Sequence, residues 1–192
     1  MQGGAVSSGK RRVLGVVGSA AGGVEALRTG LVEPAMERGW QVAVTLTPTA
    51  GQWLRMSGEV EQLEKLTGLP VRDEPRLPGE ARPHPPVDCY VVAPASANMV
   101  AKLATGLMDN QALTQVGEAI GTLGLPVVLF PRVNAAHARH PAWQHHIDTL
   151  RAGGVRIIYG PCVWTLYEPR EASAGRELPW QAVLDAVDEV TR

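Results

Sequence analysis

One stretch of the chain, residues 88–113, has the pattern of a strand, a tight loop and a helix. Cys89 to Ala93 is an unbroken apolar run that ends at Pro94, which is typical of a strand buried on both faces of a parallel sheet. From Met99 the apolar residues recur at helical spacing. In such a unit the loop lies at the carboxyl end of its strand, where open α/β sheets bind ligands.

The loop of this unit contains only small or short polar side chains. They are Ala95, Ser96, Ala97 and Asn98. Small side chains let a flat ring approach the backbone, and the N–H groups that begin a helix can bind an anion or a carbonyl group. The alternative is that Ser96 or Asn98 only caps the helix.

The same alternation of strand and helix patterns continues along the chain. Further strands are expected at residues 13–17, 40–46, 126–130 and 155–159, and helices at 24–36, 50–69 with a break near Ser57, 114–123 as a continuation of the central helix, 142–152 and 180–190. Strands that alternate with helices predict a single α/β domain, a doubly wound, Rossmann-like parallel sheet of five or six strands flanked by helices.

Composition narrows the classes of partner. The 192 residues carry a net charge of −1 and are 45% hydrophobic, so the chain has no basic footprint for nucleic acid or an anionic membrane. No segment approaches the roughly twenty apolar residues of a membrane helix, and the N-terminus lacks a signal-peptide core. We therefore expect a cytoplasmic protein. Residues 1–10 are expected to be a disordered leader, and residues 11–192 the folded domain.

Two stretches without periodicity are expected to be long loops. The first is the proline-rich segment 70–86, and the second is the segment 160–179, which we call the flap. Cys89 is expected to be a buried core residue, whereas Cys162 lies in the flap. Neither a disulfide framework nor a metal site is expected, because the four histidines between 137 and 146 are poorly spaced for one helical face.

The predicted exit loops of the first two strands indicate the kind of ligand. The first, Gly18-Ser19-Ala20, is rich in small residues but does not have the G-x-G-x-x-G spacing of a dinucleotide fingerprint. The second, Thr47-Pro48-Thr49, lacks the acidic residue that would bind a ribose. Its hydroxyl groups suit a phosphate better, although both loops could also be simple turns.

The sequence APASANMVAKLATGLMDN resembles the PASANT region of the homo-oligomeric flavin-containing cysteine decarboxylases. This family includes phosphopantothenoylcysteine decarboxylases and lantibiotic peptidyl-cysteine decarboxylases, and the similarity extends from about residue 12 to about residue 159. The resemblance implies FMN at the carboxyl edge of the sheet. It also implies a homotrimer, or a dodecamer of four trimers.

The resemblance also implies roles for individual residues. Gly18, Ser19 and Ala20 would line FMN, Thr47 and Thr49 would approach its phosphate, and Ser96, Ala97, Asn98 and Met99 would contact the flavin. Arg132, in the exit loop of the strand at 126–130, completes the cofactor-binding candidates.

The substrate motif of the family, P-A-M-N-x-x-M-W, is altered here. Pro131 and Asn134 are kept, while both methionines and the tryptophan are lost. Asn134 is the catalytic candidate that would hydrogen-bond a substrate carboxylate or amide, or else it is a helix cap. His84 is the candidate acid or base, or else a residue of the surface loop. Cys162, with Gly175 and Arg176, lies in the general region of the family's flap cysteine, without the expected L-A-C-G spelling, and is a candidate reactive thiol.

These observations favour an FMN enzyme that oxidatively decarboxylates the C-terminal cysteine of a peptide to an enethiol, as in peptide natural-product biosynthesis. A phosphopantothenoylcysteine decarboxylase is the closest alternative. A flavin-binding protein without decarboxylase activity, such as a regulatory subunit or flavin carrier, would explain the altered substrate motif. A flavin prenyltransferase is disfavoured, because only Arg132 and Arg139 could serve a second phosphate.

Overall fold

In the computed structural model, which describes residues 11–171 and 176–192, a five-stranded sheet forms the centre of the fold. The strands are β1 (Val13–Gly18), β2 (Gln41–Leu46), β3 (Cys89–Ala95), β4 (Val127–Pro131) and β5 (Arg156–Ile157). Their order is β2-β1-β3-β4-β5, and every neighbouring pair is parallel. The predicted doubly wound α/β class is confirmed.

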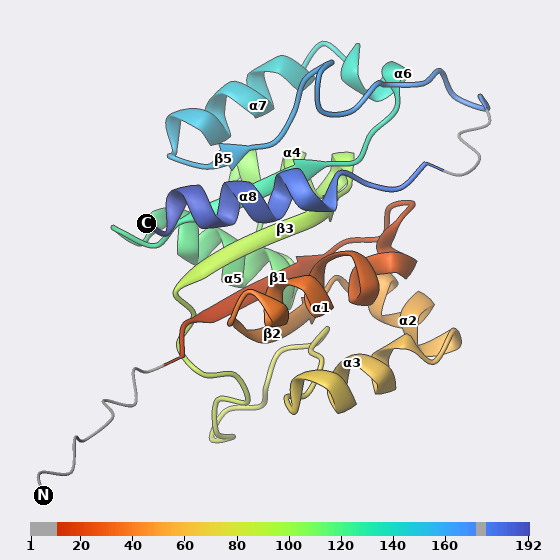
Figure 1. The fold of residues 1–192 in the computed structure, drawn as a ribbon. Helices are drawn as coiled ribbons and strands as arrows, with labels where there is room; N and C mark the ends of the chain where they lie inside the picture. The colour runs from red at the N-terminus through yellow and green to blue at the C-terminus, as the bar shows by residue number, and fades with distance from the viewer. Residues whose placement is uncertain (1–10, 172–175) are drawn as a thin grey trace, which may run out of the picture.

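Helices cover both faces of the sheet (Figure 1). They are η1 (Val24–Ala26), η2 (Arg28–Val32), α1 (Glu33–Glu37), α2 (Pro48–Met56), α3 (Glu59–Thr67), α4 (Ala97–Thr105), α5 (Gln111–Gly121), α6 (Ala135–Ala138), α7 (Trp143–Ala152) and α8 (Trp180–Val190). In Figure 1, α1 and α8 lie in front of the sheet, and α4 and α5 lie behind it. Each face therefore has its own buried cluster, one around α1 and α8 and one around α4, α5 and α7.

The central strands are buried along their whole length. All six residues of β1 are buried, and β3 is buried except at Tyr90. This burial explains the continuous apolar runs, because a strand between two helical layers has no face in contact with water. All five strands point the same way, so their exit loops gather at one edge of the sheet (Figure 1).

The helix expected to continue from the central unit is interrupted. α4 ends at Gly106, which has the left-handed φ of 73°, and the chain begins again with Asn110 as the N-cap of α5. The prediction of a continuous helix was wrong because the glycine serves as a C-cap rather than as an interior residue. Similarly, the expected helix at 24–36 divides into the short elements η1, η2 and α1.

Several expected boundaries are confirmed. The break near Ser57 separates α2 from α3, and α7 and α8 lie where the helical spacing placed them.

In the proline-rich loop, Arg72 forms a single parallel bridge to Thr45 beside β2. The expected leader at 1–10 lies outside the described residues, as does Gly175. Within the described residues, no helix is long and apolar enough to cross a membrane.

Candidate functional site

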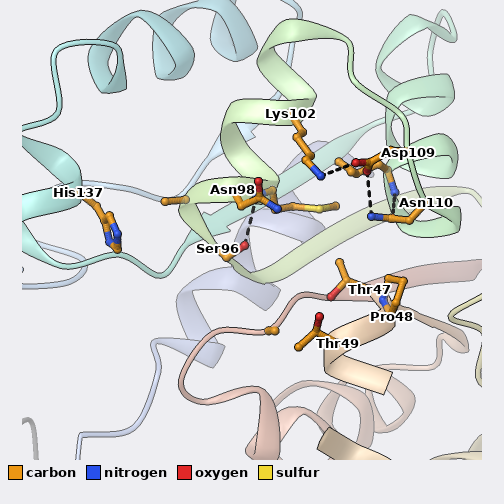
Figure 2. A pocket seen from close by; sticks show the side chains of 13 residues that line it. Thr47, Pro48, Thr49, Ser96, Asn98, Lys102, Asp109, Asn110 and His137 are labelled. Carbon is orange, nitrogen blue, oxygen red and sulfur yellow. Dashed lines mark hydrogen bonds and ion pairs between the residues drawn. The ribbon is translucent and has the colours of Figure 1, made fainter. Parts of the chain in front are cut away.

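A cavity of about 540 Å³ lies at the carboxyl edge of the sheet, between the starts of α2 and α4 (Figure 2). Its lining comes from the β1 loop (Ala20), the start of α2 (Thr47, Pro48, Thr49), α4 (Ser96, Ala97, Asn98, Met99, Lys102), the start of α5 (Asp109, Asn110, Leu113) and α6 (His137). The volume lies in the range of small-molecule and cofactor sites. The structure thus brings together seven of the ten predicted cofactor-binding residues.

The first wall of the cavity is the start of α2. Thr47 is the N-cap, but its side chain makes no capping hydrogen bond, and Pro48 occupies the first turn without an N–H group. The Thr47 backbone N–H donates to the Gly18 carbonyl at 2.9 Å, which joins the exits of β1 and β2. This leaves the side-chain hydroxyls of Thr47 and Thr49 beside a helix start, an arrangement that favours an oxyanion.

The second wall is the start of α4, where Ser96 is the N-cap. Its Oγ accepts a hydrogen bond from the Met99 N–H at 3.2 Å. Asn98 is exposed on the first turn, whereas Met99 is buried. The capping role predicted for Ser96 as an alternative is therefore observed, and Asn98 is the polar side chain of this loop that remains open to a ligand.

Ser19 holds the two central loops together. Its buried hydroxyl donates to the Pro94 carbonyl at 2.8 Å and accepts from the Ser96 N–H at 2.7 Å. Gly18 is also buried, and a Cβ there would lie 2.9 Å from a Leu46 methyl group. These two residues position the loops, while Ala20 is the member of the predicted triplet that faces the cavity.

Several residues that line the cavity were not predicted from the sequence. The Lys102 ammonium group pairs with Asp109 at 2.5 Å, and Asn110 caps α5 through its Oδ1, which accepts from the Leu113 N–H at 3.0 Å. The turn at Gly106 brings these residues back to the cavity. An Asp-Asn pair shortly after a glycine was the available signal for a new helix start.

Asn134 does not line the cavity itself but caps α6. Its Oδ1 accepts a hydrogen bond from the His137 N–H at 2.9 Å, and His137 does line the cavity. The cap uses only the oxygen of the amide. Within the described residues the Nδ2 group has no hydrogen-bond acceptor, so it remains able to donate to a ligand.

His84 lies outside the cavity. Its Nε2 is 2.7 Å from the Pro70 carbonyl, within the proline-rich loop, and burial lowers the pKa of the imidazole. The structure therefore does not bring His84 together with Asn134 in one chain. Sequence spacing could not show this, because the path of a long loop, and so the position of each residue in it, cannot be read from the sequence.

Arg132 also lies outside the cavity lining. Its guanidinium carbon lies 4.9 Å from the centre of the Trp164 ring, which belongs to the same buried cluster as Phe130. Cys162 is exposed at the start of the flap. The structure thus separates these two predicted residues from the group around Thr47 and Asn98.

The fold and the cavity together define an α/β protein whose ligand site lies at the carboxyl edge of a parallel sheet. The family follows from comparison with known proteins. The model of the Flavoprotein family matches residues 5–192, and the chain belongs to this family. The family resemblance drawn from the PASAN loop is confirmed.

Individual relatives agree with this placement. The bifunctional coenzyme A biosynthesis protein CoaBC of Escherichia coli is 30% identical over 161 residues, which is 80% of this chain and 36% of that protein. The chain therefore spans about a third of the length of this curated relative. TvaF of thioviridamide biosynthesis has a TM-score of 0.66 at 24% identity, covering 94% of this chain and 98% of TvaF. The cypemycin decarboxylase CypD has a TM-score of 0.67 at 18% identity, and the match covers 95% of this chain and 94% of CypD.

The cavity fits a flavin mononucleotide. A phosphate requires N–H and hydroxyl donors, which the start of α2 and the two threonines provide. An isoalloxazine ring requires a flat approach to the backbone, and Ala20 and Ala97 expose only methyl groups there. Asn98 adds a polar group for the ring edge.

Proposed function

We propose that the chain binds FMN in the cavity and oxidatively decarboxylates a substrate that ends in cysteine, with a peptide as the favoured substrate. One observation carries this proposal: the oxyanion-binding start of α2 and the small-residue start of α4 face each other across one cavity, with His137 beside it (Figure 2). TvaF is described as an FMN-dependent cysteine decarboxylase, which supports the same assignment.

In this reaction the bound flavin would accept two electrons from the cysteine side chain. The oxidised substrate is a thioaldehyde, which releases CO₂ and leaves an enethiol. The net change is therefore the loss of CO₂ and two hydrogens.

The chain would contribute orientation and proton transfer. The free Nδ2 group of Asn134 would donate to the substrate carboxylate, while its Oδ1 stays on α6. The His137 imidazole, rather than that of His84, lines the cavity and would accept the thiol proton.

Two alternatives remain specific enough to test. CoaBC supports a phosphopantothenoylcysteine decarboxylase, because the matched relative belongs to coenzyme A biosynthesis. A flavin-binding protein without decarboxylase activity is favoured by the missing methionines around Asn134.

The test begins with the visible absorption spectrum of the purified protein and continues with mass spectrometry. Peptides ending in cysteine and phosphopantothenoylcysteine are incubated separately with the FMN-loaded protein. We expect a flavin spectrum and peptides that are lighter by the mass of CO₂ and two hydrogens. Loss from phosphopantothenoylcysteine alone would support the first alternative, and a flavin spectrum with no mass change in any substrate would support the second.

A substitution at Asn134 tests whether this residue binds the substrate carboxylate. Asn134→Asp keeps the oxygen that caps α6 but replaces the amide donor with a charge that repels a carboxylate. We expect FMN binding to persist and kcat/KM to fall by about 10- to 100-fold, the range for a lost hydrogen bond to a charged group. Unchanged turnover would remove Asn134 from the substrate site. The control is Gln62→Glu, which makes the same amide-to-carboxylate change at an exposed position of α3, away from the cavity.

A further inference from the structure

A pair of arginines gathers on one tryptophan beside the cavity. The guanidinium carbons of Arg132 and Arg176 lie 4.9 and 3.7 Å from the centre of the Trp164 ring, and that of Arg176 lies 4.8 Å from the Tyr167 ring. Arg132 comes from the exit of β4, whereas the other three residues belong to the flap. The cluster therefore joins the carboxyl edge of the sheet to the flap.

Within the described residues, no ion pair balances the positive charge of this cluster, and Glu25 is the one carboxylate that acts on Arg132 from a distance. Neither arginine forms an ion pair there, and Arg176 donates only to the Thr165 carbonyl, at 2.9 Å. Stacking on an aromatic ring stabilises each cation, but two neighbouring cations repel each other. The pKa of Arg132 is lowered, first by burial and then by the charge of Arg176.

Two buried donors in the cluster lack acceptors. In the described part of the chain, the Arg132 Nε and the Trp164 Nε1 atoms are both buried without a hydrogen-bond partner. Both are N–H groups, so what is missing is an acceptor. Leaving a buried donor unpaired is destabilising. An oxyanion bound at the two guanidinium groups would supply the cluster with an acceptor and reduce the repulsion between the two cations.

The position of the cluster relative to the cavity restricts which oxyanion binds. Arg132 lies beside Gly22, whose Cβ position would be 3.9 Å from its Nη2 atom, and Ala20 of the same loop lines the cavity. The glycine-rich loop thus separates the cluster from the cavity. Two arginines on the reacting carboxylate would stabilise it more than the neutral CO₂ that leaves, which would slow the reaction. The cluster therefore suits a group that does not react.

We propose that Arg132 and Arg176, held against Trp164, bind a second, non-reacting oxyanion of the substrate. This inference rests on the proposed function and specifies its substrate class: a cysteine-terminated molecule that carries a further carboxylate or phosphate. The source is either an acidic residue upstream of the terminal cysteine of a peptide or the phosphate of phosphopantothenoylcysteine.

The test measures binding rather than turnover. Calorimetry on the FMN-loaded protein compares two pairs of probes that cannot be decarboxylated as cysteines: serine-terminated peptides with Glu or Gln at each of the three preceding positions, and phosphopantetheine against pantetheine. We expect the charged member of one pair to bind about tenfold more tightly, as one charge-assisted hydrogen bond allows. The peptide pair and the pantetheine pair distinguish the two sources.

Variants of Arg176 test whether the preference for charged over neutral probes depends on the cluster. Arg176→Gln should remove the tenfold preference, Arg176→Lys should retain part of it because the charge remains, and the control Arg170→Gln, at an exposed flap position, should retain all of it. Equal binding of charged and neutral probes to the unmodified protein would overturn the proposal. So would an unchanged preference in Arg176→Gln.

FMN affinity distinguishes this proposal from binding of the cofactor phosphate by the cluster. Mass spectrometry distinguishes its failure from failure of the decarboxylase assignment. If Arg176→Gln loses affinity for FMN but not for riboflavin, the cluster binds the cofactor phosphate and the proposal is overturned. A charge preference that depends on Arg176, together with no loss of CO₂ from any cysteine substrate, would support the oxyanion site and refute the decarboxylase assignment.

Discussion

At the scale of single residues, the hydroxyl of Ser19 has the most consequence for the site. It is buried, and it connects the exit of β1 to the Pro94 carbonyl and the Ser96 N–H. The Ser19 backbone N–H also donates to Pro94, at 3.1 Å, so the carbonyl keeps one partner without the hydroxyl. The Ser96 N–H, in contrast, would lose its acceptor without the hydroxyl.

Ser19→Ala should therefore lower the free energy of unfolding by about 1–2 kcal/mol, because it leaves the partly buried Ser96 N–H without its acceptor. It should also weaken FMN binding, since Ser96 begins the helix that faces the cavity. Urea unfolding and flavin titration measure the two effects. Thr105→Ala, which removes an exposed hydroxyl bonded within α4, is the control and should change neither. An unchanged FMN affinity in Ser19→Ala would contradict the positioning role.

The two thiols should differ strongly in reactivity. Cys89 is buried, and burial raises the pKa of its thiol to about 12, so almost no thiolate forms at neutral pH. Cys162 is exposed. At pH 8 a thiol-specific reagent should label one group in the native protein and two after unfolding. Peptide mapping should place the native label on Cys162, and native labelling of Cys89 would show that β3 opens.

At the scale of elements, close approach of α8 to the region of η2 fixes how one face of the sheet is covered. Gly30 lies in η2, and a Cβ at this position would overlap the indole of Trp180, the first residue of α8. Glycine is thus required here by packing, not by backbone conformation. The pattern of apolar residues gave no indication of this contact, because the two elements are far apart in sequence.

Gly30→Ala should destabilise the protein by about 1–3 kcal/mol, the usual cost of overpacking a core contact. Gly121→Ala at the end of α5 is the matched control, because a Cβ there meets no atom within 4 Å. The control should be neutral or slightly stabilising, since alanine favours a helix over glycine. Thermal unfolding of both variants checks the prediction, and equal melting temperatures would contradict it.

At the scale of the whole molecule, large apolar side chains are exposed near the ends of α2 and α4. Trp53 is 48% exposed and Met56 is 83% exposed on α2, and Leu107 and Met108 are 56% and 47% exposed after α4. Apolar surface of this kind favours association. The predicted homotrimer would cover it with a second copy of the chain.

Light scattering coupled to size exclusion should therefore give about three times the 20.5 kDa chain mass, or a multiple of the trimer. Met56→Glu should shift the protein toward monomer, because a charge placed in an apolar interface is costly. Leu123→Glu, at a fully exposed position after α5, is the control and should leave the mass unchanged. A monomer mass for the unmodified protein would contradict the prediction.

The sequence alone determined the α/β class, the places of the strands and the loop that begins α4. These depend on local periodicity, because strands buried between helices must be continuously apolar and a capped helix start has its own signature. The family resemblance also rested on residues that are close together in the chain.

The tertiary structure decided which predicted residues share one site. It placed Ala20, Thr49 and Asn98 around the cavity with His137, and it left His84 and Arg132 outside. It also placed Arg132 beside Arg176, which follows it by more than forty residues. Distances between loops depend on strand order and on the paths of long connections. Neither is encoded in any short stretch of sequence.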